Sequence, residues 1–178
     1  MAMLEKNGYG QVEIQKLTAQ VTGELVSQCR LSEEAATALE GKVNQGIFLT
    51  QNAKNEYVIP TDGGDDTTVL VYNEIRNYIE WQLDKDYVMK TEDHIDGICY
   101  PRGYVPSTTD VFTTNMIDLG TKTYETVAVG DPVRLISGIL TVSEAAVAED
   151  KLAYVVDKVY TMPDGQKGIK VRCVKAHA

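Results

Sequence analysis

The last third of the chain, residues 126–176, reads TVAVGDPVRLISGILTVSEAAVAEDKLAYVVDKVYTMPDGQKGIKVRCVKA. Short runs of alternating apolar residues are separated there by turn sequences at 130–132, 137–138 and 163–165. This spacing is typical of hairpins in a small β-barrel or sandwich. We therefore expect a mainly β protein in which residues 119–178 form a C-terminal β-barrel or hairpin region.

The alternation also predicts which side chains fill the interior of this region. In the predicted register Leu135 points inward and Arg134 points outward, so removing the Arg134 side chain should cost less than about 0.5 kcal/mol. The Asp164-Gly165 pair supplies the positive φ values of a tight turn. The expected interior residues are Val127, Val129, Val133, Leu135, Ile139, Val155, Val159, Ile169 and Val171.

Composition restricts the function classes. The 178 residues suffice for one substantial domain, and the net charge of −9 argues against nucleic acid or an anionic membrane as the main partner. The longest basic stretch, 166–172, is better read as the solvated face of a hairpin. Cys29, Cys99 and Cys173 are far apart, which favours reduced thiols in a product of the cytosol. We expect no signal peptide and no transmembrane helix.

The rest of the chain is divided by its turn residues into two parts. Residues 1–23, with Gly8 and Gly10 around Tyr9, are expected to form an extended N-terminal arm. Residues 24–118 are expected to form a β-rich body with Tyr-rich loops and few short helices. Ser32 is placed to cap one of these helices, and residues 74–86 fit either a helix or a loop.

Candidate catalytic and metal-binding residues are weak. Asp62, Asp65 and Asp66 form an acidic loop that could hold a hard cation, but its spacing matches no EF-hand and a solvated turn is the better interpretation. His94 lies near acids and Cys99 without a partner at metal-ligand spacing. No nucleophile motif or phosphate-binding loop is present. We predict no catalytic site, no metal and no cofactor.

Three stretches together resemble the head structural proteins of tailed bacteriophages. They are the opening MAMLEKNGYGQVEIQ, the interior VLVYNEI and the closing series VAVGDPVRL, ISGILTV, YVVDKV and DGQKGIKVRCV. The resemblance is to the capsid decoration, or cement, class. It implies a non-enzymatic virion protein on the capsid exterior, made in the host bacterial cytoplasm. Its expected partner is the lattice of the major capsid protein, with a homotrimer or other self-association possible.

The partner-binding residues are expected in the arm. Tyr9 would serve as an anchor while residues 4–15 add a strand to the partner chain. Two alternatives remain open: another virion component, such as a head fibre base or a head-tail or tail subunit, and a small cytosolic ligand-binding barrel or enzyme. A convergent polar pocket would favour the last of these. The predicted binding residues are Asn7, Tyr9, Gln11, Val12 and Ile14.

Overall fold

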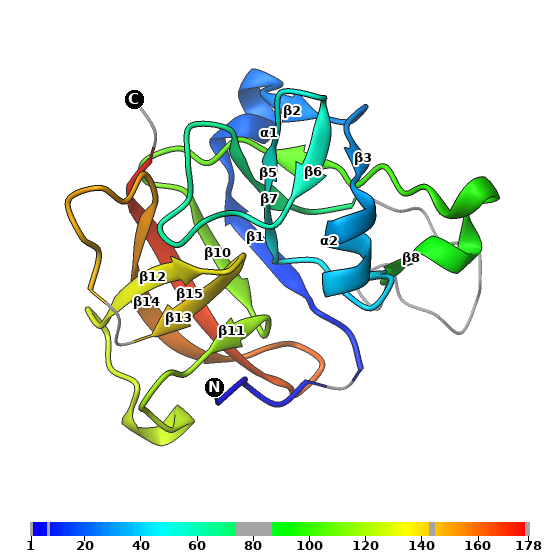
Figure 1. Ribbon diagram of the computed structural model, residues 1–178. Helices are drawn as coiled ribbons and strands as arrows, with labels where there is room; N and C mark the ends of the chain where they lie inside the picture. The colour runs from blue at the N-terminus through cyan, green and yellow to red at the C-terminus, as the bar shows by residue number, and fades with distance from the viewer. Residues whose placement is uncertain (1, 7, 74–86, 143–144, 177–178) are drawn as a thin grey trace.

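The computed structural model describes residues 2–6, 8–73, 87–142 and 145–176. It is mainly β, as the sequence predicts, with two sheets packed against each other, a small two-stranded ribbon and only short helices (Figure 1). The predicted helix or loop at 74–86 lies outside the described residues.

The larger sheet has seven strands and curls towards a half-barrel (Figure 1). The pairs are antiparallel except β11 with β13. Its strands, in spatial order, are β1 (Val12–Lys16), β10 (Val111–Thr114), β15 (Lys167–Lys175), β14 (Ala153–Thr161), β12 (Pro132–Ile136), β13 (Ile139–Val142) and β11 (Ile117–Asp118).

The hairpin of β14 and β15 is the longest element of this sheet, with nine residues in each strand. Its turn is closed by the N–H of Gly165, which donates to the carbonyl of Met162 at 2.8 Å. Gly165 has φ 84°, so the predicted role of glycine at this tight turn is confirmed. The turn therefore fixes the register of the last two strands.

The predicted interior is correct in β12 and β15 and at Val127, whereas Val129 is exposed and Ile139, in β13, is only partly buried. Leu135 is fully buried, whereas Val129 is 70 % exposed because it lies in the turn that precedes Pro132. Register shifts in the pairing of β14 and β15 bury Tyr154 and Val156, so Val155 and Val159 are only partly buried. Irregular pairing of this kind breaks a strict two-residue alternation.

The predicted division of the chain at residue 119 does not coincide with the sheets. Strand β1 comes from the first residues and β10 from the middle, yet both pair into the seven-stranded sheet with the C-terminal strands. The partners of β1 and β10 are about one hundred residues apart in sequence, and those of β10 and β15 about sixty. The last third is therefore not a separate barrel, because its sheet is completed by the N-terminal segment.

The second sheet has six strands. Phe48, Leu70 and Tyr104 face the seven-stranded sheet, whereas Leu49 and Val69 face a second core. The ring of Phe48 packs edge-on against Tyr154, with centroids 5.8 Å apart, and so joins the two sheets. The strands, in order, are β2 (Leu25–Val26), β9 (Gly103–Tyr104), β7 (Thr68–Val71), β5 (Phe48–Gln51), β6 (Glu56–Val58) and β3 (Arg30–Leu31).

Short elements cover the second core. Helix α2 (Glu33–Ala38) begins where the Ser32 hydroxyl accepts the N–H of Ala35 at 3.1 Å, which confirms the predicted cap. The remaining elements are α1 (Thr18–Thr22), the ribbon of β4 (Lys42–Val43) and β8 (Met89–Lys90), and the 3-10 turns η2 (Thr91–Asp93), η3 (Ile95–Gly97) and η4 (Tyr124–Thr126).

Candidate functional site

The residues predicted to bind a partner lie in and beside β1, an edge strand of the chain's own sheet. Gln11 and Val12 are buried, and Tyr9 and Ile14 are half-buried. The N–H of Gln11 donates to the side chain of Asn115 at 2.7 Å, while Val12 pairs with Thr114 in β10. Asn7 lies outside the described residues. The segment is extended, as the sequence predicts, but its backbone pairs with β10 of the same chain and its apolar side chains pack against the chain's own core.

The first residues are held in the same way. The N–H of Ala2 donates to the carboxylate of Asp118 at 3.0 Å, and that of Leu4 to the carbonyl of Ile117 at 3.0 Å. The side chain of Leu4 is 4 % exposed and belongs to the main core. The N-terminal segment thus runs along β10 and β11, and a partner can reach it only at its outer edge.

The acidic loop is a bridge between the two sheets. The Asp62 carboxylate accepts the N–H of Ser137, in the β12–β13 turn, at 3.0 Å. The N–H of Gly63 donates to the carbonyl of Leu135 at 2.7 Å, and the Gly63 carbonyl accepts the N–H groups of Lys151 and Leu152 at 3.0 Å each. The loop connects β6 to β7 but is also bonded to the larger sheet: Gly63 is buried there, while Asp62 and Asp66 stay exposed to solvent.

One strong polar contact was not foreseen from the sequence. Arg134 donates two hydrogen bonds, each 2.9 Å long, to the two carboxylate oxygens of Asp150, which is 2 % exposed. Burial alone would raise the pKa of Asp150, but the bonds from Arg134 and from the Val147 N–H hold that pKa below its ordinary value. The sequence contains both residues, but nothing in it indicates that Arg134 and Asp150, 16 positions apart, form a pair.

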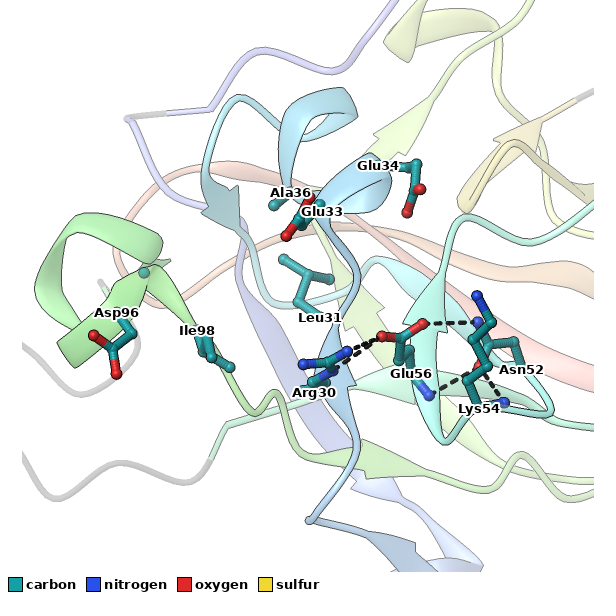
Figure 2. Close-up of a pocket in the computed structure, with 11 residues that line it drawn as sticks. Arg30, Leu31, Glu33, Glu34, Ala36, Asn52, Lys54, Glu56, Asp96 and Ile98 are labelled. Atoms are coloured by element: carbon teal, nitrogen blue, oxygen red, sulfur yellow. Dashed lines mark hydrogen bonds and ion pairs between the residues drawn. The ribbon is translucent and has the colours of Figure 1, made fainter.

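A polar groove of about 400 Å³ lies at the edge of the smaller sheet (Figure 2). Strands β3 and β6 supply Arg30 and Glu56, and the first turn of α2 supplies Glu33 and Glu34. The opposite wall is the segment after η2, which contributes Asp96 (Figure 2). Nothing in the alternation of apolar residues indicates that these three segments meet.

The groove contains more negatively than positively charged side chains. Arg30 forms an ion pair with Glu56, and this hydrogen bond lowers the pKa of the Glu56 carboxyl. No ion pair of Glu33, Glu34 or Asp96 occurs with any residue that the structure describes. Lys54 also lines the groove, so four carboxylates face two cations. The groove is therefore net acidic at neutral pH, and a cationic group is the ligand that would suit it.

A short segment projects beyond α2, at the right of Figure 1. It is shaped by the N–H of His94 donating to the carbonyl of Thr91 at 3.2 Å and by that of Gly97 donating to the carbonyl of His94 at 3.1 Å. Ile95 at its tip is 91 % exposed, and Tyr100 nearby in sequence is 50 % exposed. An ordered backbone here presents an apolar side chain to solvent.

The strand pair β14 and β15 carries a basic face. The ammonium groups of Lys158 and Lys170 lie 5.5 Å and 5.9 Å from the centroid of the Tyr160 ring. Lys167 lies 4.7 Å from the ring of Tyr124. Contacts of this kind between a cation and an aromatic face are weakly attractive. The basic stretch predicted to be solvated is thus an organised surface of two strands.

Elsewhere in the described part of the chain, the side chains that most often bind metals are not grouped. Cys29, Cys99 and Cys173 are free and buried, and burial raises the pKa of each thiol. Within the described ranges, no three His, Cys, Asp or Glu side chains are grouped to hold a metal ion. No helix in the same part of the chain is both long and apolar enough to cross a membrane.

The chain was compared with models of protein families, with curated proteins and with solved structures, and none of them matched. The features available for a functional interpretation are thus the acidic groove, the projecting Ile95 segment, the basic face and the outer edge of β1.

Proposed function

We propose that the chain is a structural protein of a tailed-phage virion that binds the outer surface of the capsid and stabilises the shell. The resemblance of its opening and its C-terminal hairpins to decoration proteins motivates this function. The mainly β fold is the fold that the resemblance implies. A protein that binds the assembled lattice better than free subunits stabilises the lattice through linkage, and many copies multiply a modest contact.

The observation that carries the proposal is the exposed side chain of Ile95. Ile95 is 91 % exposed. Covering such a large apolar side chain with a partner removes it from water and therefore favours binding. Tyr100, half-exposed in the same segment, adds an aromatic surface of the kind enriched at interfaces. This segment takes the place of the N-terminal residues as the expected anchor, because Gln11 and Val12 are buried in the chain itself.

The test uses shells assembled from the major capsid protein encoded in the same genome. The purified chain should co-sediment with these shells to a saturating copy number and should remain in the supernatant with unassembled capsid subunits. It should also raise the temperature at which the shells dissociate. Absence of saturable co-sedimentation with the shells would refute the proposal.

A matched pair of variants locates the contact. Ile95→Asp should weaken shell binding at least tenfold, since it places a charge where an apolar contact is proposed. Val21→Asp is the control, because Val21 is equally exposed at 89 % but lies on α1. Equal binding by the Ile95 variant and the wild type would remove the anchor role from this segment.

Two alternative functions are separated by further measurements. A head fibre base or a head-tail or tail subunit would be found at one vertex or on tails when intact particles are labelled with gold-conjugated antibody. The polar groove favours a small ligand-binding protein, and a thermal-shift screen of cationic metabolites tests this function. A ligand that stabilises the chain while shells do not bind it would favour the second alternative.

A further inference from the structure

Charge is distributed very unequally along the chain. Residues 151–178 contain six Lys or Arg and two Asp, whereas residues 1–150 contain eleven Lys or Arg and twenty-four Asp or Glu. The C-terminal strand pair is therefore cationic on an otherwise acidic protein. Such an asymmetry within one molecule favours contact between unlike surfaces of neighbouring copies.

The cationic surface has a defined centre. Lys158 and Lys170 flank the half-buried ring of Tyr160 from neighbouring strands, and neither forms an ion pair with an acidic residue in the described ranges. The next cation along β15, Arg172, is already matched by Asp157, with the two atoms 3.6 Å apart. The two lysines thus lack the opposite charge that their neighbour has.

The acidic groove has the complementary arrangement. Glu33, Glu34 and Asp96 line it without an ion-pair partner among the described residues. Its two cations are Arg30, which is paired with Glu56, and Lys54, so carboxylates outnumber cations by four to two. The groove is open and holds about 400 Å³, which is room for the ends of lysine side chains. It lies at the edge of the smaller sheet, away from the β14–β15 face on the larger sheet (Figures 1 and 2).

We propose that the Lys158 and Lys170 face of one chain docks against the groove lined by Glu33, Glu34 and Asp96 on a second copy. The two surfaces are different, so the contact is head-to-tail, and repetition gives a closed ring or an open chain of copies. Each copy contributes one cationic and one acidic surface. This self-association follows from the charges of the chain itself and does not rest on the proposed capsid role.

The experiment uses two charge-reversed variants of the full chain. Lys158→Glu with Lys170→Glu removes the cationic surface and leaves the groove intact. Glu33→Lys with Glu34→Lys removes the acidic surface and leaves the lysines intact. Glu33→Gln with Glu34→Gln is a milder version, in case lysines at the start of α2 weaken the helix. Circular dichroism and thermal melting establish that each variant is folded before the masses are compared.

Sedimentation equilibrium then measures the mass of each sample. The wild type should form oligomers whose mass rises with concentration to a ring or continues to grow. Each charge-reversed variant alone should sediment as a monomer. An equimolar mixture of the two should associate again, because the intact cationic face of one variant meets the intact groove of the other and the two charge-reversed surfaces are also opposite in sign.

A control of equal charge change is Lys16→Glu with Lys42→Glu, both exposed and outside the two surfaces; it should associate as the wild type does. A monomeric wild type, dimers of either folded variant alone, or a mixture that stays monomeric would each overturn the proposal. Because no shell is present, failure here is distinct from failure of the capsid proposal.

Discussion

The guanidinium of Arg134, in strand β12, holds the buried carboxylate of Asp150, in the loop before β14, by two hydrogen bonds of 2.9 Å. Arg134 does point to the opposite side of its strand from the buried Leu135, as the alternation predicts. That side is covered at this position, however, by the loop that carries Asp150. The outward face of a strand is therefore not always a solvent face.

Removing the Arg134 side chain should destabilise the folded protein strongly. Arg134→Ala leaves the carboxylate of Asp150 buried without its cation, and we expect a loss of about 3–5 kcal/mol in the free energy of unfolding. Leu135→Ala should cost about 2–5 kcal/mol through the cavity that it creates. Urea denaturation measures both. Arg172→Ala breaks an exposed pair and serves as the control, with an expected cost of at most about 1 kcal/mol.

The same pair makes stability sensitive to acid. Because the pKa of Asp150 is depressed in the folded state, its contribution is full above the unfolded pKa of about 4 and is lost as pH falls through the folded pKa. The urea midpoint should therefore fall less steeply below pH ~4 in Asp150→Asn than in the wild type. Asp157→Asn should keep the wild-type slope. Identical slopes in all three proteins would contradict the assignment.

Substitution of Gly63 and Gly165 by alanine distinguishes backbone strain from a steric clash. Both have positive φ, 80° and 84°, so alanine at either position is strained by about 1–2 kcal/mol. A Cβ on Gly63 would also lie 1.9 Å from a carboxylate oxygen of Asp150, whereas nothing lies within 4 Å at Gly165. Gly63→Ala should therefore lower the thermal midpoint clearly more than Gly165→Ala. Equal shifts would mean that the acidic loop does not press on Asp150.

Neighbouring residues test the attachment of the N-terminal segment. Leu4 is 4 % exposed and Met3 is 37 % exposed, although they are adjacent. Leu4→Ala should lower the free energy of unfolding by about 2–5 kcal/mol, and Met3→Ala by less than about 0.5 kcal/mol. Guanidinium denaturation measures the difference. Two small and equal effects would show that this segment is not anchored to the core.

The three cysteine thiols should be unreactive in the folded protein. Burial raises the pKa of Cys29 to about 11 and that of Cys173 to about 12, and it raises the pKa of Cys99 as well. At pH 8 none of them should react with Ellman's reagent on a time scale of minutes, while all three should react in denaturant. Rapid labelling of one thiol in the native protein would show that its surroundings open.

Local signals predicted local structure well. The Ser32 cap and the turn at Gly165 each depend on residues a few positions apart, and each is confirmed. The burial of Leu135 follows from the same short-range alternation. Turn chemistry and strand periodicity act over such distances, which is why a single sequence contains them.

Long-range pairing was not predictable in the same way. The N-terminal residues look like an arm because glycines surround Tyr9, and nothing nearby in sequence indicates that β1 pairs with β10. The groove likewise joins Arg30, Glu56 and Asp96 from three separate segments. The acidic loop around Gly63 has the composition of a solvated turn, yet its bonds are to distant strands.

The pairing of β1 with β10, and of β10 with β15, also limits when the protein can fold. During synthesis residues 12–16 leave the ribosome first, but their sheet cannot close until residues 167–175 have been made. Strands so distant in sequence bear a large loop-closure entropy and pair slowly. The N-terminal segment therefore cannot complete its sheet until almost the whole chain has been made, and its apolar residues lack their final packing until then.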